Sequence, residues 1–125
     1  MLDLMPEWTM DVERGPEWLF IRLHGPLDGE AEGIDLANRI WRTLEQQFTY
    51  RLVLELDDLD ILRSCLLGQL VMLHKRIHDH DGMLRLSGLS ENSLAALQAC
   101  RLDHSFSRYR TREEAVMSHL PAKPR

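Results

Sequence analysis

Three residues whose side chains could take part in chemistry, Arg63, Ser64 and Cys65, are consecutive in the sequence. In general, a thiol that lies next to a guanidinium at the start of a helix ionises readily and can act as a nucleophile or a redox sensor. The surrounding motif does not favour either role. A catalytic cysteine loop that binds phosphate needs an arginine where Val71 stands, and a redox pair needs a second cysteine where Gly68 stands. We therefore interpret Cys65 as a small, partly buried residue that fills a helix start.

Histidines at positions 74, 78 and 80 form a second candidate site. His74 and His78 lie one helical turn apart, so both can face one metal ion, with His80 or Asp81 as a third ligand. Polar and cationic side chains are also typical of the carboxyl end of a helix, where they interact favourably with the helix dipole. We favour this second interpretation, and we predict neither a bound metal nor a cofactor.

Asp57, Asp58 and Asp60 suggest a carboxylate cluster for a divalent cation or for acid–base chemistry. They also have the composition of a polar turn, because aspartate side chains readily accept hydrogen bonds from nearby backbone groups. The turn is the simpler interpretation. The sequence therefore predicts no catalytic residue, and an enzyme that depends on cysteine or a metal is the least favoured function.

These residues follow a segment whose pattern indicates a strand that leads into a helix. Residues 52–56 form an apolar run interrupted only by Glu55, as expected for a strand covered on both faces. We predict that Ser64 is the N-cap of the helix and that Gly82 ends it in the left-handed conformation. A helix that begins just after a strand is a common place for α/β proteins to bind anions or partners. The apolar residues at helical spacing are Leu66, Leu67, Leu70, Val71, Leu73 and Ile77.

The rest of the sequence alternates between strand and helix patterns. Further predicted strands cover residues 8–13, 17–23, 83–87 and 106–110. Further predicted helices run from Glu30 to about Gln47, from Ser90 to Cys100 and from Thr111 to about His119. This order predicts an α/β fold with one mixed, mostly parallel sheet of about five strands, an antiparallel N-terminal edge strand and four helices. We expect a single domain over residues 8–119, a lead-in over residues 1–7 and a disordered tail over residues 120–125.

Composition narrows the class of partner. The chain has 125 residues and a formal net charge of -5, and its 15 basic residues form no run or stripe, which argues against a nucleic-acid partner. Two cysteines without close spacing are too few for a disulfide framework and suit a reducing compartment. No apolar run approaches the length of a membrane span. We therefore expect a cytoplasmic protein that does not insert into membranes.

Several segments, taken in their order and spacing, resemble the STAS domain, the family of bacterial anti-sigma factor antagonists and their relatives. GPLDGEAE is similar to the family's entry to its first helix, and LVLELDDLDIL to its central strand and loop. LLGQLVMLHKRIHDHDGMLRLSGLS is similar to the second helix with the strand and turn that follow, and LQACRLDHSFSRYRTREEAV to the end of the domain. The resemblance covers residues 8–116, nearly the whole chain.

The resemblance implies a regulatory protein–protein interaction module and not an enzyme. In typical members, an anti-sigma factor with kinase activity binds the unphosphorylated domain, and phosphorylation at the start of the second helix breaks the complex. The family's motif Asp-Ser-Ser-Gly matches residues 63–66 here. Cys65 stands at the acceptor position, while Arg63 replaces the acid and Leu66 the glycine. The resemblance therefore predicts that the phosphorylation switch is lost or has moved to Ser64.

The resemblance also predicts where a protein partner binds, namely the loop before the second helix and the start of that helix. The predicted partner is an anti-sigma factor of the serine-kinase type. The alternative is a scaffold, with the domain as an unphosphorylated accessory subunit of a stress-signalling or lipid-transport assembly. A homodimer is left open. The predicted contact residues are Asp28, Asp57, Asp58, Asp60, Arg63, Ser64, Cys65, Leu66, Leu67 and Gln69.

Overall fold

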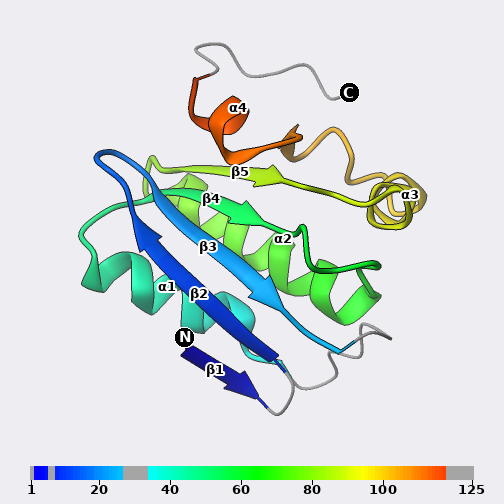
Figure 1. The fold of residues 1–125 in the computed structure, drawn as a ribbon, viewed down its shortest axis with the longest axis horizontal. Coiled ribbons are helices and arrows are strands. Elements are labelled where there is room, and N and C mark those ends of the chain that lie inside the picture. Colours follow the sequence, from blue (N-terminus) through cyan, green and yellow to red (C-terminus); the bar gives the residue numbers. More distant parts are fainter. Residues whose placement is uncertain (1, 6–7, 27–33, 118–125) are drawn as a thin grey trace.

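The computed structural model describes residues 2–5, 8–26 and 34–117, and these residues form one mixed sheet with four helices (Figure 1). The strands lie in the sheet in chain order, the first three antiparallel and the rest parallel. The predicted α/β fold is confirmed. The strands are β1 (Leu2–Met5), β2 (Trp8–Arg14), β3 (Leu19–His24), β4 (Arg51–Glu55), β5 (Met83–Ser87) and β6 (Ser107–Tyr109), and the helices are α1 (Leu36–Gln46), α2 (Ser64–Asp79), α3 (Glu91–Ala99) and α4 (Arg112–Met117).

Strand β1 is the largest difference from the predicted sheet. It lies within the segment predicted as a lead-in and pairs antiparallel with β2, so β1 and not β2 is the N-terminal edge strand. The segment LDLM is too short for its periodicity to separate a strand from a loop, and only the neighbouring strand gives its backbone groups hydrogen-bond partners. The predicted tail at residues 120–125 lies outside the described residues.

Helices α1 and α2 lie together on one face of the sheet (Figure 1). Because side chains alternate along a strand, every second residue of β3 points into this layer, including Leu19, Ile21 and Leu23, which are fully buried. Leu52 and Leu54 of β4 join the same core. This apolar core is the main source of stability, since each buried aliphatic side chain contributes about 1.5–3 kcal/mol of transfer free energy.

The opposite face of the sheet is covered in part by α4. A small second core forms there from Trp18, Phe20, Val53 and Ala115. Thr111 caps α4 as the capping-box pattern predicts, since the backbone N–H of Glu114 donates to its hydroxyl at 3.2 Å. The remaining residues on this face of β2, β3 and β4 are mostly charged. The two faces of the sheet therefore differ in composition: one carries apolar side chains, and the other carries mainly charged side chains.

Several helix ends differ from their predicted positions. Helix α1 begins at Leu36, after Asp35, and not at Glu30, which lies outside the described residues. Helix α2 ends in a left-handed turn at Asp81 (φ 57°), where Gly82 was predicted to adopt that conformation. Gly82 serves a steric purpose instead, because a Cβ at this position would collide with the carbonyl oxygen of Tyr50.

Candidate functional site

The carboxyl ends of the parallel strands β3, β4 and β5 meet at one edge of the sheet, and the predicted site lies there. The loop of residues 56–63, here called the β4–α2 loop, leads from β4 to α2. Ser64 and Cys65 are both exposed at the start of that helix, so the interpretation of Cys65 as a partly buried residue is wrong. Asp28, predicted as a contact residue from the neighbouring loop, lies outside the described residues.

The start of α2 differs by one residue from the prediction. Arg63 is the N-cap, with extended backbone angles, and the Leu67 N–H donates to the Arg63 carbonyl at 2.9 Å. Ser64 is therefore the first helical residue and not the cap, and no side-chain hydrogen bond caps this helix. The hydroxyl of Ser64 lies on the surface and is not engaged in capping, which corrects the prediction.

Two of the predicted contact residues lie beneath the surface. Leu66 is fully buried and Leu67 is 4% exposed, so both anchor α2 in the core and cannot touch a partner directly. Gln69 is half-buried, and its Oε1 accepts a hydrogen bond from the Ala37 N–H at 2.8 Å. Gln69 thus satisfies a donor at the start of α1 and sets the spacing of the two helices.

The outward face of α2 carries apolar residues that the sequence pattern misplaced. Val71, which helical spacing grouped with the apolar residues on one side of the helix, is 40% exposed, and Met72 is 57% exposed. Gly68, one turn earlier on the same helix, faces open space, because a Cβ added there would meet nothing within 4 Å. Lys75 is also exposed. Helical spacing alone misplaces Val71 because it lies at the border of the buried stripe, where the packing of α1 decides exposure.

The β4–α2 loop is held at its far end by α3. The Ser90 hydroxyl donates to the Asp60 carbonyl at 2.6 Å and accepts from the Ser93 N–H at 3.0 Å, which confirms Ser90 as the N-cap of α3. Leu59 and Leu62 are buried and fix the middle of the loop. Asp60 therefore has a structural role through its backbone oxygen.

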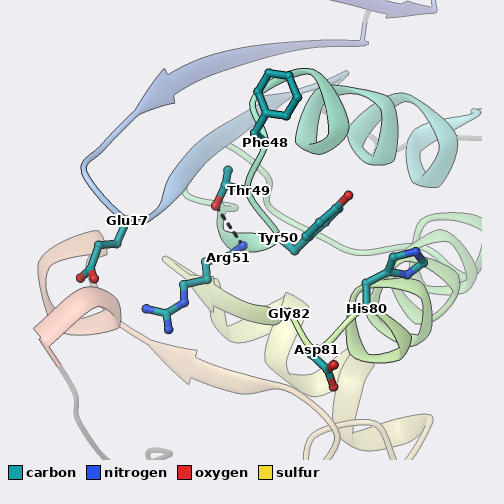
Figure 2. A pocket seen from close by; sticks show the side chains of 8 residues that line it. All are labelled: Glu17, Phe48, Thr49, Tyr50, Arg51, His80, Asp81 and Gly82. Atoms are coloured by element: carbon teal, nitrogen blue, oxygen red, sulfur yellow. Dashed lines mark hydrogen bonds between the residues drawn. The ribbon is translucent and has the colours of Figure 1, made fainter.

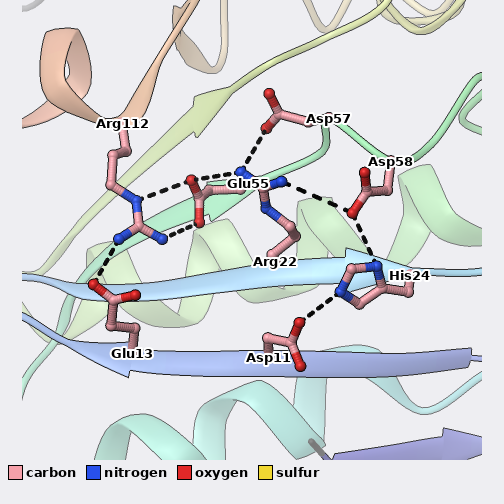
Figure 3. Close-up of polar contacts among 8 residues, drawn as sticks. All are labelled: Asp11, Glu13, Arg22, His24, Glu55, Asp57, Asp58 and Arg112. Carbon is pink, nitrogen blue, oxygen red and sulfur yellow. Dashed lines mark hydrogen bonds and ion pairs between the residues drawn. The ribbon is translucent and has the colours of Figure 1, made fainter.

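The near end of the loop is held by two side chains of β3, Arg22 and His24 (Figure 3). Arg22 lies 3.8 Å from Asp57 and 3.9 Å from Asp58, and His24 Nδ1 lies 2.9 Å from Asp58 Oδ2. Gly88 (φ 72°) makes room for the loop, because a Cβ there would collide with the Asp57 carboxyl group. The two aspartates are thus bound by side chains of the protein itself, in agreement with their interpretation as part of a polar turn.

Glu55 is the centre of the same charged network. Its carboxylate is 3% exposed and accepts two hydrogen bonds from Arg112, at 3.0 and 2.5 Å, and one from Arg22 at 3.4 Å. Burial by itself would raise the pKa of Glu55, but the contacts with Arg112 and Arg22 hold its pKa below the ordinary value. Arg112 also donates to Glu13 at 2.7 Å. The network thereby joins β2, β3, β4 and α4.

The histidine cluster does not form. His74 packs against Phe106 with ring centroids 5.0 Å apart, whereas His80 packs edge-on against Trp41 at 4.5 Å. The side chains therefore contact different parts of the core. Within the described part of the chain, no group of three or more histidine, cysteine or acidic side chains is arranged to hold a metal ion.

A cleft of about 330 Å³ lies at the other end of the sheet, where β4 and β5 begin (Figure 2). Tyr50 and His80 line one part of it, with ring centroids 5.6 Å apart, and Arg51 and Glu17 line another. Phe48 at its rim is 91% exposed. No local pattern predicted this cleft, because it combines three loops, and it lies far from the start of α2.

The signature of the STAS domain matches residues 9–115. Comparison with curated proteins finds no match. Within the described residues, no helix has the length and apolar composition needed to cross a membrane.

The fold is similar to solved structures at low sequence identity. An anti-sigma factor antagonist from Mycobacterium paratuberculosis has a TM-score of 0.71 and 19% identity, over 87% of this chain and 91% of that one. A STAS domain protein from Planctomyces limnophilus has a TM-score of 0.69 and 23% identity, over 86% and 95%. A candidate anti-sigma factor antagonist from Thermotoga maritima has a TM-score of 0.66 and 20% identity, over 86% and 91%.

Proposed function

Because the chain belongs to the STAS domain family, we propose that it is a non-enzymatic regulatory module that binds a protein partner in the manner of an anti-sigma factor antagonist. The observation that carries this proposal is the exposed start of α2. Ser64 and Cys65 lie on the surface there, above Leu66 and Leu67, which fix the helix in the core. A rigid helix end beside a tethered loop provides a preformed surface for a partner.

The proposed contact surface consists of the β4–α2 loop and the outward face of α2. Gly68, Val71 and Met72 provide an apolar centre, and Arg63 and Lys75 add positive charge at its two ends. Apolar side chains at the centre with charged residues at the rim are typical of specific protein interfaces. A partner with an apolar patch and acidic neighbours would fit this surface.

The phosphorylation switch of the family is altered in this chain. Cys65 occupies the acceptor position, and protein serine kinases transfer phosphate to a hydroxyl, so we propose that modification at that position is lost. Ser64 carries the remaining hydroxyl, and as the first helical residue it is exposed. A phosphate on Ser64 would be stabilised by the N-terminus of α2 and would reverse the local charge beside Arg63.

The test is to purify the tagged protein from its native cells, identify co-purifying proteins and map phosphate on Ser64. We expect an ATP-binding anti-sigma factor to be retained, and we expect Met72→Glu to weaken its binding about tenfold or more by placing a charge in the apolar centre. Met117→Glu is the matched control, because Met117 is 74% exposed on α4 and lies outside the proposed surface. Unchanged binding by Met72→Glu would contradict the proposal.

The altered acceptor position also supports a second function, that of a scaffold subunit. A domain without a switch would stay bound to its assembly under all conditions. In that case the same purification would yield a large complex without an ATP-binding partner, and Ser64→Asp would leave the complex intact. If Ser64 carries the switch, Ser64→Asp would release the partner while Ser64→Ala would retain it.

A further inference from the structure

The β4–α2 loop has an unusual number of negative charges at the point where it leaves the sheet. Asp57 and Asp58 follow Glu55 almost directly, and Asp11 lies on the same face of β2. Without cations between them, these carboxylates would repel one another and push the loop away from the sheet. The conformation of the loop therefore depends on the donor side chains that face these carboxylates.

The two side chains that face the loop, Arg22 and His24, come from one strand, β3. Arg22 and His24 lie two residues apart and so point to the same face of the sheet. Arg22 is the direct neighbour of Glu55 in the parallel pairing of β3 with β4, and its guanidinium reaches both Asp57 and Asp58. One guanidinium thus contacts three carboxylates, all of them before the start of α2.

His24 extends this contact to a second strand. Its Nδ1 lies 2.9 Å from Asp58 Oδ2, and its Nε2 lies 2.8 Å from Asp11 Oδ2. In the protonated imidazole both nitrogens donate, so a single ring can join β2 to the β4–α2 loop. Figure 3 shows Asp11, His24 and Asp58 connected in this way, with Arg22 beside them.

We propose that Arg22 and His24 are positioning residues, which hold Asp57 and Asp58 against the sheet and so fix the conformation in which the β4–α2 loop presents Ser64 and Cys65. This inference rests on the proposed function of that loop. Asp60 fixes the far end of the loop through its contact with Ser90, the N-cap of α3, and the buried Leu59 and Leu62 fix its middle. The contacts from β3 fix the near end of the loop. Both ends must be fixed to hold a loop of this length in one conformation.

The experiment uses the free full-length protein and needs no partner. Amide hydrogen exchange is measured for residues 56–65, together with the alkylation rate of Cys65 in a Cys100→Ser background, since both cysteines are exposed. We expect His24→Leu and Arg22→Met each to increase exchange of the Leu59 amide, which donates to the Leu56 carbonyl at 3.1 Å, about tenfold, and alkylation of Cys65 by a smaller factor. Asp58→Ala removes the carboxylate that His24 contacts and should have the same effect as His24→Leu.

Arg112→Met is the matched control for general loss of stability. Arg112 belongs to the same network but contacts Glu55 and Glu13 and not the β4–α2 loop. It should lower the stability of the fold while leaving exchange of the Leu59 amide unchanged. His24→Asn should rescue the loop, because its amide can still donate to Asp58.

The proposal is overturned if His24→Leu and Arg22→Met leave loop exchange unchanged, or if Arg112→Met raises it equally. Because these readouts use the protein alone, they fail or succeed independently of partner binding. A loop that loosens as expected in a protein that binds no partner would retain this inference and reject the proposed function.

Discussion

The two faces of the sheet are held in place by different interactions. On the face covered by α1 and α2, the strands contribute leucine and isoleucine side chains that are fully buried. On the other face, β2, β3 and β4 contribute Glu13, Arg22, His24 and Glu55, which form a network of ion pairs, and only a small apolar core lies under α4. The same strands thus build a dry layer on one side and a charged layer on the other.

The two faces of the sheet therefore have different roles: one stabilises the fold, and the other positions the β4–α2 loop. Burial of apolar area is strong but has little directional preference, so the helix-covered face contributes most of the free energy of folding. Ion pairs with partly exposed partners contribute less free energy but require defined geometry. The charged face therefore suits the placement of the β4–α2 loop, whereas the apolar face suits the anchoring of α2. Substitutions on the two faces should differ accordingly in their effects.

The largest expected effect is on the apolar face. Leu54→Ala should lower the free energy of unfolding by about 3–4 kcal/mol, because it leaves a cavity between β4 and the helices. Val53, its neighbour on the same strand, is equally buried but faces α4, and Val53→Ala should cost about 1–2 kcal/mol. Urea denaturation measures both. A larger loss for Val53→Ala would show that the α4 face dominates stability and would reverse the comparison.

Glu55→Gln should have the next largest effect. The amide leaves Arg112 and Arg22 without their shared buried anion, and we expect a loss of about 2 kcal/mol at neutral pH, less than for a fully buried pair because both arginines are partly exposed. Because the pKa of Glu55 is lowered by folding, its contribution is present above its ordinary pKa of 4.5 and is lost as the pH falls below that value. Urea denaturation from about pH 7 to about pH 3 measures this, and the variant should show a smaller acid-dependent loss than wild type. An equal acid-dependent loss of stability in the variant and in the wild type would show that a group other than Glu55 is responsible.

The smallest effect is expected at His74, on the helix-covered side. Burial, with a smaller contribution from the charge of His78, lowers the pKa of His74 from its ordinary value of 6.5. The unfolded chain then binds a proton more readily than the folded protein, so stability is full above pH 6.5 and falls as the pH drops through the lowered pKa. His74→Leu should remove this part of the pH dependence below pH 6.5. His104→Gln, whose side chain is 82% exposed, is the control, and an equal change in both variants would contradict the prediction.

Much of the fold follows from local patterns in the sequence. The strands and helices of residues 8–117 lie close to their predicted positions, and β5 matches residues 83–87 without a shift. The errors fall where two local interpretations are equally good. Ser64 and Arg63 both suit the junction of loop and helix, and Asp81 and Gly82 both suit a left-handed turn. Neighbouring segments decide such cases, as Tyr50 does by its contact with Gly82.

The candidate site was predicted less completely. Its position at the start of α2 followed from the strand–loop–helix pattern, and the exposure of Ser64 and Cys65 agrees with it. The sequence did not show that Arg22 and His24 face the loop. Their alternation with Leu23 was the available signal, since it places both on the polar side of a strand.

The order of strands and helices, the apolar face of each and membership of the STAS domain family can be recognised in the amino-acid sequence, because these depend on periodicity and on motifs that lie close together along the chain. Which charges meet, in contrast, depends on the tertiary structure. Arg22 and Glu55 are 33 residues apart, and Arg112 and Glu55 are 57 apart. Their contacts require the pairing of β3 with β4 and the packing of α4. Ion pairs of this kind have no local signature, because a charged residue on a strand is equally compatible with water and with a partner brought to it by the fold.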